Sequence, residues 1–161
     1  MTRVGSAKRP ARRCGGDDGA LLVELGLVAV VLFLVVFGVI DLGRAYALQN
    51  RLANSAREGA ASAQFKPRNV DTGCASGSNV VDRASSEDTG LTSLSGFAIT
   101  VAKSVSGTQT TYTGCGTANV SAGDTVVVTV KADFSPLTPL MGSIMGNTIS
   151  MSKSVSVVVQ G

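Results

Sequence analysis

Histidine and tryptophan are absent from this 161-residue chain, and aromatic residues make up only 4% of it. Without histidine there are no Ser-His or Cys-His catalytic pairs and no histidine-containing metal sites. The low aromatic content, with 19 glycines and many serine, threonine and valine residues, indicates a small β-rich folded part rather than a large core. No clustered carboxylate motif replaces the missing histidine, so we expect no enzyme, no cofactor and no small-molecule substrate.

The excess positive charge is confined to the N-terminus. Residues 1–19 hold five basic and two acidic residues, whereas the rest of the chain holds nine of each. A nucleic-acid-binding domain would carry its basic residues on the folded part. We therefore expect no nucleic acid as a partner.

A single long apolar run extends from Ala20 to Ile40, and Glu24 is its only charged residue. As a helix, these 21 residues would span about 31 Å, close to the ~30 Å hydrocarbon core of a bilayer. Basic residues crowd its N-terminal flank, so the positive-inside rule places the N-terminus in the cytoplasm. We predict a basic cytoplasmic leader over 1–19, a single transmembrane helix over 20–40 in the cytoplasmic (inner) membrane, and a C-terminal domain outside.

Three interpretations of this run are open. In a plain signal anchor, Glu24 lies about one turn from the cytoplasmic end and reaches the interface. In a cleaved secretory signal, the small residues of Ala45–Ala47 direct cleavage before Leu48. In the third, cleavage after Gly19 makes Ala20 the first residue and leaves its amine one helical turn from the carboxylate. That carboxylate can then pair with the amine of a neighbouring subunit.

Two motifs in register surround the apolar run. The basic leader, Gly19, four apolar residues and Glu24 look like a prepilin-type (class III) signal. The second motif consists of Gly38, Asp41, Gly43, Arg44 and the run Ala56–Ala60. With both motifs, the segment from Gly19 to Ala63 is similar to the TadE-like pilus-assembly proteins of the tight-adherence system.

The resemblance implies a non-catalytic pseudopilin or minor pilin that acts in assembly of a tight-adherence (type IV-like) pilus. It implies processing between Gly19 and Ala20 by a prepilin peptidase, with Glu24 as the assembly contact. Implied partners are other pilin-like subunits, a membrane platform and a cytoplasmic motor ATPase, and the protein either stays in the membrane or enters the extracellular pilus. Asp41 and Arg44 are expected to form an ion pair at the outer interface. The alternative is a single-pass, membrane-anchored exported module that binds a ligand and has no pilus role.

The helix is predicted to continue beyond the membrane, because no proline interrupts the chain between Ala20 and Pro67. A helix of this length measures about 70 Å. Its second part, 41–66, is amphipathic and carries a side of small residues over Ala56–Ala63. We expect this side to pack on the protein's own sheet rather than on helices of a filament.

Residues 67–161 are predicted to form an extracytoplasmic loop and sheet domain. A short helix is expected around Val80–Ser86 within an otherwise irregular 67–95. Alternating apolar residues predict three strands, at Phe97–Val101, Val126–Phe134 and Ile149–Val159. The fold class is therefore α+β, with a long N-terminal helix, first transmembrane and then amphipathic, packed against a small antiparallel sheet of about three strands. The connection Ser135–Gly146 is expected to form a turn at the end of the sheet, or else to touch the membrane or a partner.

The three cysteines fall on both sides of the predicted membrane. Cys14 lies in the leader, whereas Cys74 and Cys115 lie outside. Two thiols in an oxidising compartment predict a Cys74–Cys115 disulfide that closes a loop of about forty residues and contributes ~3–4 kcal/mol. Two thiols without histidine do not suffice for a metal site, so we expect none.

Overall fold

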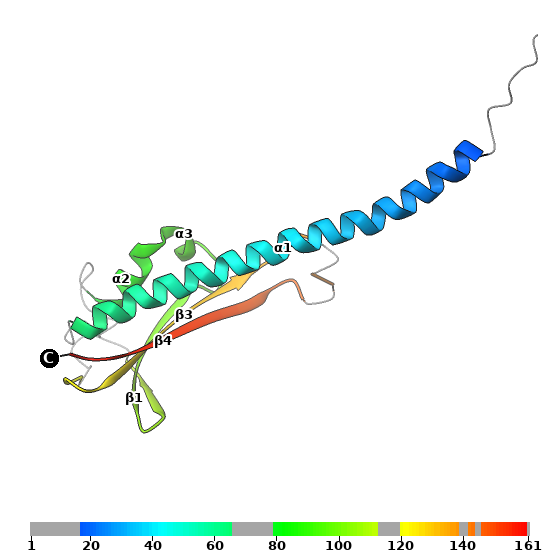
Figure 1. Ribbon diagram of the computed structural model, residues 1–161. Coiled ribbons are helices and arrows are strands. Elements are labelled where there is room, and N and C mark those ends of the chain that lie inside the picture. The colour runs from blue at the N-terminus through cyan, green and yellow to red at the C-terminus, as the bar shows by residue number, and fades with distance from the viewer. Residues whose placement is uncertain (1–16, 66–78, 113–119, 139–141, 144–145, 161) are drawn as a thin grey trace, which may run out of the picture. The chain divides into compact units, whose positions relative to one another are not determined.

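The computed structural model describes residues 17–65, 79–112, 120–138, 142–143 and 146–160. The chain divides into two compact units, Met1–Phe37 and Gly38–Gly161. Helix α1 (Asp17–Phe65) supplies residues to both of them (Figure 1).

The first unit contains the apolar beginning of α1. Leucine and alanine favour the helix. Phe33 and Phe37 stack one turn apart, with 6.1 Å between ring centroids. In the described part of the chain, α1 is the one helix long and apolar enough to cross a membrane, and no residue of its apolar window is buried. It fits a single-pass membrane anchor.

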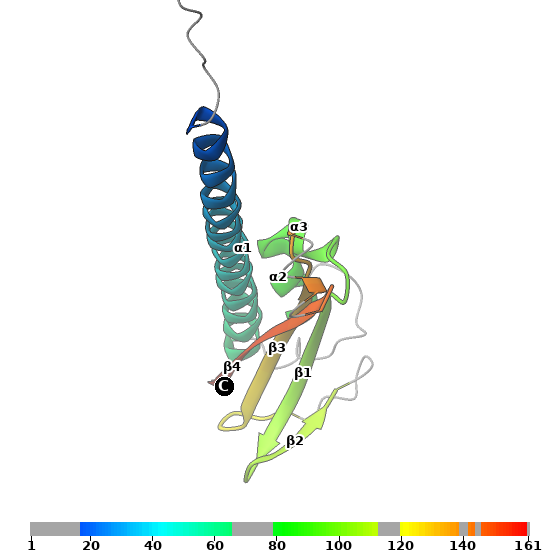
Figure 2. The same ribbon diagram turned by 90° about the vertical axis from the view of Figure 1, so that its right-hand side faces the viewer.

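The second unit is built on an antiparallel sheet in the order β2-β1-β3-β4. Its strands are β1 (Ala98–Val105), β2 (Thr108–Thr111), β3 (Thr125–Phe134) and β4 (Ile149–Val158). Figure 2 shows β1 and β3 at the centre of the sheet, with the second part of α1 alongside it. The predicted α+β class is confirmed, but the sheet in the described part of the chain has four strands rather than about three.

The strand that the sequence analysis missed is β2. Its four residues are all exposed and polar, so it lacks the apolar alternation that predicts a strand. Ser106 and Gly107 both have positive φ, 50° and 86°. They form the two-residue turn between β1 and β2, a geometry that suits the twist of a hairpin. The Ser-Gly pair was therefore the available signal for this strand.

The core of this unit lies between α1 and one face of β3. Alternate residues of β3, Val126, Val128, Val130, Ala132 and Phe134, are buried on that face. From α1, the buried residues Leu48, Leu52, Ala56, Ala60 and Ala63 recur at three- and four-residue steps. The small side chains let the helix approach the sheet closely. The expectation that Ala56–Ala63 packs on the protein's own sheet is confirmed.

Two short helices close the same core. Helix α2 (Val80–Glu87) matches the predicted short helix, and α3 (Thr89–Thr92) lies where a loop was expected. The buried Ser55 hydroxyl of α1 donates to the carbonyl of Ala84 at 2.6 Å. This bond satisfies a polar group that would otherwise be costly to bury.

An ion pair joins α1 to the start of α3. The Arg51 guanidinium donates to both carboxylate oxygens of Asp88, one of them at 2.9 Å. Asp88 also caps α3 by accepting from the Gly90 N–H at 3.0 Å. The Arg51 hydrogen bond is the main reason why the pKa of Asp88 is lowered.

Strand β4 has a hydrogen-bonded neighbour on one side only within the described residues. It alternates apolar residues with serines along most of its length. Lys153 interrupts the apolar side, because it lies directly opposite the buried Val130 of β3 and is itself exposed. The inner side of this edge therefore carries a charge.

Candidate functional sites

The first candidate site occupies the opening turns of α1, in the first unit. Gly19, Ala20 and Glu24 are exposed, and a Cβ added at Gly19 would meet nothing within 4 Å. Ala20 and Glu24 are four residues apart, which in a helix is about 6 Å along the axis and on nearly the same side.

The surroundings of Glu24 are apolar. The flanking Val23 and Leu25 are both exposed, at 72% and 64%. A carboxylate in lipid is stabilised by a cationic partner, and the apolar run from Ala20 to Ile40 contains no lysine or arginine. The geometry thus places the carboxylate one turn from the amine that cleavage after Gly19 would produce.

The second candidate site lies in the second unit, around Asp41 of α1. Asp41 is only 3% exposed. Its carboxylate accepts the Leu137 N–H at 3.0 Å, the Thr138 N–H at 3.1 Å and the Thr138 hydroxyl at 2.6 Å. Asp41 comes after the predicted span, and its pKa is lowered, first by the Thr138 hydroxyl and then by the Leu137 N–H. We call Asp41, Leu137 and Thr138 the Asp41 clamp.

Arg44 is a further partner of this carboxylate. Its guanidinium Nη1 lies 3.4 Å from Asp41 Oδ1, and its side chain is about half exposed. The guanidinium carbon also lies 5.5 Å from the centre of the Phe134 ring, a cation–π distance. Arg44 therefore contacts both the clamp and the end of β3.

The sequence predicts Arg44 as the partner of Asp41, but it does not predict Leu137 and Thr138. These two residues are 96 and 97 positions away from Asp41, so no local pattern connects them. The feature that could have identified them is a pair of backbone N–H groups and a hydroxyl shortly after the end of β3, where the hydrogen-bonded pairing of the strand stops. Such donors need an acceptor, and Asp41 supplies it.

The predicted Cys74–Cys115 disulfide stays a prediction, because both cysteines lie outside the described residues. Among the residues that the structure does describe, no group of three or more His, Cys, Asp or Glu side chains could hold a metal ion.

A comparison with protein families decides which group the helix resembles. The model of the TadE-like protein family matches residues 19–61. Residues 19–61 are a TadE-like segment. This match confirms the resemblance stated from the sequence, and the TadE-like segment contains Glu24, Asp41 and Arg44. The match concerns this segment of the 161-residue chain, which includes the apolar part of α1. Comparisons with curated proteins and with solved structures found no match.

Proposed function

We propose that this protein is a TadE-type pseudopilin or minor pilin that acts in assembly of a tight-adherence pilus. The observation that carries the proposal is the TadE-like segment itself, because it begins at Gly19 and coincides with the apolar part of α1 and its continuation. The protein is inserted with its N-terminus in the cytoplasm, and its sheet domain lies outside. Its role is structural rather than catalytic.

Maturation removes the basic leader between Gly19 and Ala20. The bond to be cut lies in the first turn of α1, which begins at Asp17. This turn opens easily, because the first four N–H groups of a helix have no intrahelical partner. A prepilin peptidase at the inner face of the membrane therefore reaches the bond with little unwinding.

Glu24 then becomes the assembly contact. Its carboxylate, exposed among apolar side chains, pairs with the Ala20 amine of an adjoining subunit. A charge-assisted hydrogen bond of this kind is strongest where water is excluded. The bond also fixes the axial position of one subunit against the next, because a misplaced neighbour leaves the carboxylate unpaired among apolar side chains, which is unfavourable.

The burial pattern of α1 supports this division of roles. The small residues Ala56, Ala60 and Ala63 are buried in the protein's own core. The apolar surface of the first unit is exposed and has no cover of its own. Lipid and the helices of other pilin-like subunits are the natural cover for such a surface. The further partners are the prepilin peptidase, the membrane platform and the motor ATPase.

The N-terminus of the mature protein tests this proposal. The full chain is extracted from membranes of cells with an active prepilin peptidase and of matched cells without it, and intact mass and N-terminal sequence are measured. The proposal expects Ala20 as the first residue only in the first case. A chain that begins at Met1 or Thr2 in both cells contradicts processing, and one that begins at Leu48 identifies a secreted domain instead.

A further inference from the structure

The exposed apolar side chains of the second unit are concentrated at one end. Among the described residues from Gly38 onward, the exposed large apolar side chains are Val39, Ile40, Leu42, Tyr46, Phe65, Val105, Leu137 and Val158. Four of these eight belong to the first turns of α1 in this unit. Leu137 joins them through the Asp41 clamp, although it is far away in the sequence.

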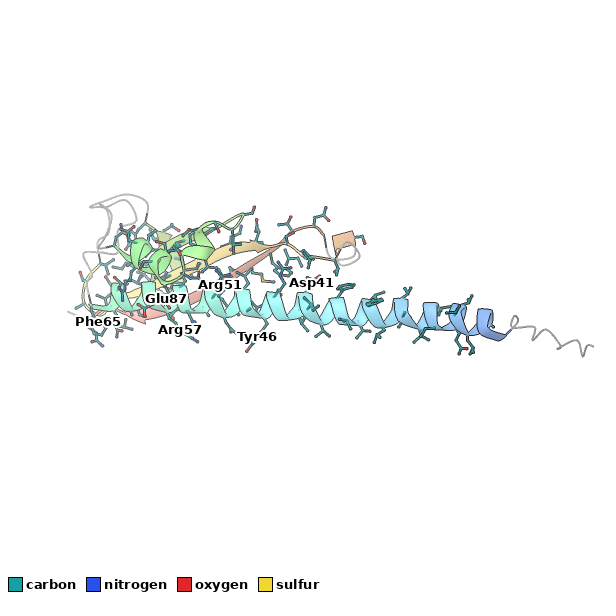
Figure 3. All side chains as sticks on the ribbon, turned by 90° about the horizontal axis from the view of Figure 1, so that it is seen from above. Asp41, Tyr46, Arg51, Arg57, Phe65 and Glu87 are labelled. Carbon is teal, nitrogen blue, oxygen red and sulfur yellow. The ribbon has the colours of Figure 1, made fainter. Side chains whose placement is uncertain are left out.

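The clamp fixes the height of Leu137 along α1. Asp41 directly follows the apolar run that ends at Ile40, and the Leu137 N–H lies 3.0 Å from its carboxylate. A helix rises only about 1.5 Å per residue, so the Leu137 backbone is level with the end of the run. Figure 3 shows Asp41 on the side of α1 that faces the sheet and Tyr46 on the opposite side.

The Leu137 side chain is exposed, although its backbone is held in place. Its exposed fraction is 68%, and the buried carboxylate of Asp41 fixes the backbone. Thr138 uses both its N–H and its hydroxyl on the same carboxylate, so the turn is held by three hydrogen bonds. An apolar side chain on a fixed turn beside a membrane-spanning helix matches the interfacial layer of a bilayer, where apolar and aromatic groups such as Tyr46 gather.

We propose that the Leu137–Thr138 turn is a second membrane contact of this protein, in which the Leu137 side chain enters the outer head-group layer of the bilayer. The partner is the phospholipid surface and not another subunit, because the turn is level with the edge of the predicted span. The proposal rests on the membrane anchoring in the proposed function. Asp41 is the positioning residue, since it holds the turn without touching lipid itself.

Tryptophan scanning tests this contact, because the chain contains no tryptophan and each variant therefore has one emitter. The full-length variants Leu137→Trp, Val31→Trp and Val105→Trp are reconstituted into phosphatidylcholine–phosphatidylglycerol vesicles. Quencher-labelled lipids place the quencher either near the head groups or deep in the bilayer. Val31 lies in the apolar run, and Val105 is an exposed control at the β1–β2 turn. That turn is paired near Thr125, at the far end of β3 from Phe134, roughly 30 Å away.

The expected result is different for each variant. Leu137→Trp loses at least about half of its emission with the shallow quencher and less with the deep one, as interfacial residues do. Val31→Trp is quenched most by the deep quencher, and Val105→Trp by neither. If Leu137→Trp behaves like Val105→Trp while Val31→Trp is quenched, the second contact is refuted and the anchor stands. If Val31→Trp is not quenched either, the anchor itself fails, and with it the proposed function.

A second arm tests the role of the clamp. Asp41→Ala in the Leu137→Trp background removes the acceptor of all three hydrogen bonds, and we expect shallow quenching to fall about twofold as the turn leaves its position. Thr138→Val keeps the shape and removes only the hydroxyl, so it covers the case in which Asp41→Ala does not fold. We expect a smaller fall in the same direction. Unchanged quenching in a folded Thr138→Val variant contradicts positioning by the clamp.

Discussion

Helix α1 packs tightly against its neighbours at Gly59, and this contact gives a sharp prediction for Gly59→Ala. A Cβ added there would lie 3.0 Å from the Ala84 Cβ and 3.1 Å from a Val128 methyl group. Carbon atoms in contact normally lie about 3.5–4.0 Å apart. Neither neighbour can rotate away, because Ala84 has no side-chain torsion and Val128 is a stiff β-branched residue in a central strand.

Two effects of opposite sign determine the result. Alanine in place of glycine in a helix interior gains about 0.8–1.0 kcal/mol in helix propensity. An extra methyl group in a filled core costs about 1–3 kcal/mol. We therefore expect Gly59→Ala to destabilise the second unit by about 1 kcal/mol. The matched control is Gly43→Ala, where an added Cβ meets nothing within 4 Å, so only the gain is left.

Thermal unfolding of the full chain in detergent, followed by circular dichroism of the strands, measures this difference. One kcal/mol corresponds to a shift in Tm of roughly 4 °C for a domain of this size. The Tm of Gly59→Ala should be below that of the wild type, and the Tm of Gly43→Ala should be equal to it or above. A Gly59→Ala protein as stable as Gly43→Ala would refute the close contact between α1, α2 and β3.

Three further predictions follow from the two units. Glu24→Ala should leave insertion and cleavage intact but abolish assembly, measured as the amount of protein recovered in a sheared pilus fraction. The control Val31→Ala should assemble. Normal piliation in Glu24→Ala would contradict the proposed contact. The arginine partner of Asp88 lowers the folded-state pKa of this carboxyl group. The ion pair therefore contributes to stability above the unfolded-state pKa of about 3.9, and this contribution is lost as the pH falls through the folded-state pKa. Urea unfolding at several pH values below 5 should therefore show a smaller loss of stability in Asp88→Asn than in the wild type, and equal losses would contradict the ion pair. Cys74 and Cys115 should form a disulfide, so reduction should change the gel mobility of the wild type but not that of Cys74→Ser. Unchanged mobility of the wild type on reduction would contradict the disulfide.

The periodic features of the fold could be predicted from the sequence. Leu48, Leu52 and Ala56 recur at helical spacing, and Val126 and Val128 alternate as in a strand, so the sequence pattern already identifies the two surfaces that meet in the core. Each surface depends on a local repeat of apolar residues, and burial of that repeat is what stabilises the element.

Features without an apolar repeat could not be predicted in the same way. Strand β2 is polar, and its position depends on pairing with β1. The Asp41 clamp joins residues 96 and 97 positions apart through hydrogen bonds, and one carboxylate gives no sequence pattern that identifies its donors. Gly19 and Glu24 were identified by a lone charge within an apolar run and by a resemblance. Their proposed roles involve a peptidase and a neighbouring subunit rather than a contact within the fold.

The lysine on the open edge of β4 has a consequence for a protein confined to a membrane plane. Confinement raises the local concentration of identical chains. A ten-residue strand whose outer edge has no partner among the described residues invites a second copy to extend the sheet. Such an extension would place an incoming strand beside Lys153, whose charge lies on the inner side of the edge, and an inward-pointing charge disfavours edge-to-edge pairing. The opposite edge, β2, has only four residues and offers little to extend. Crowded copies can therefore accumulate while their sheets stay separate.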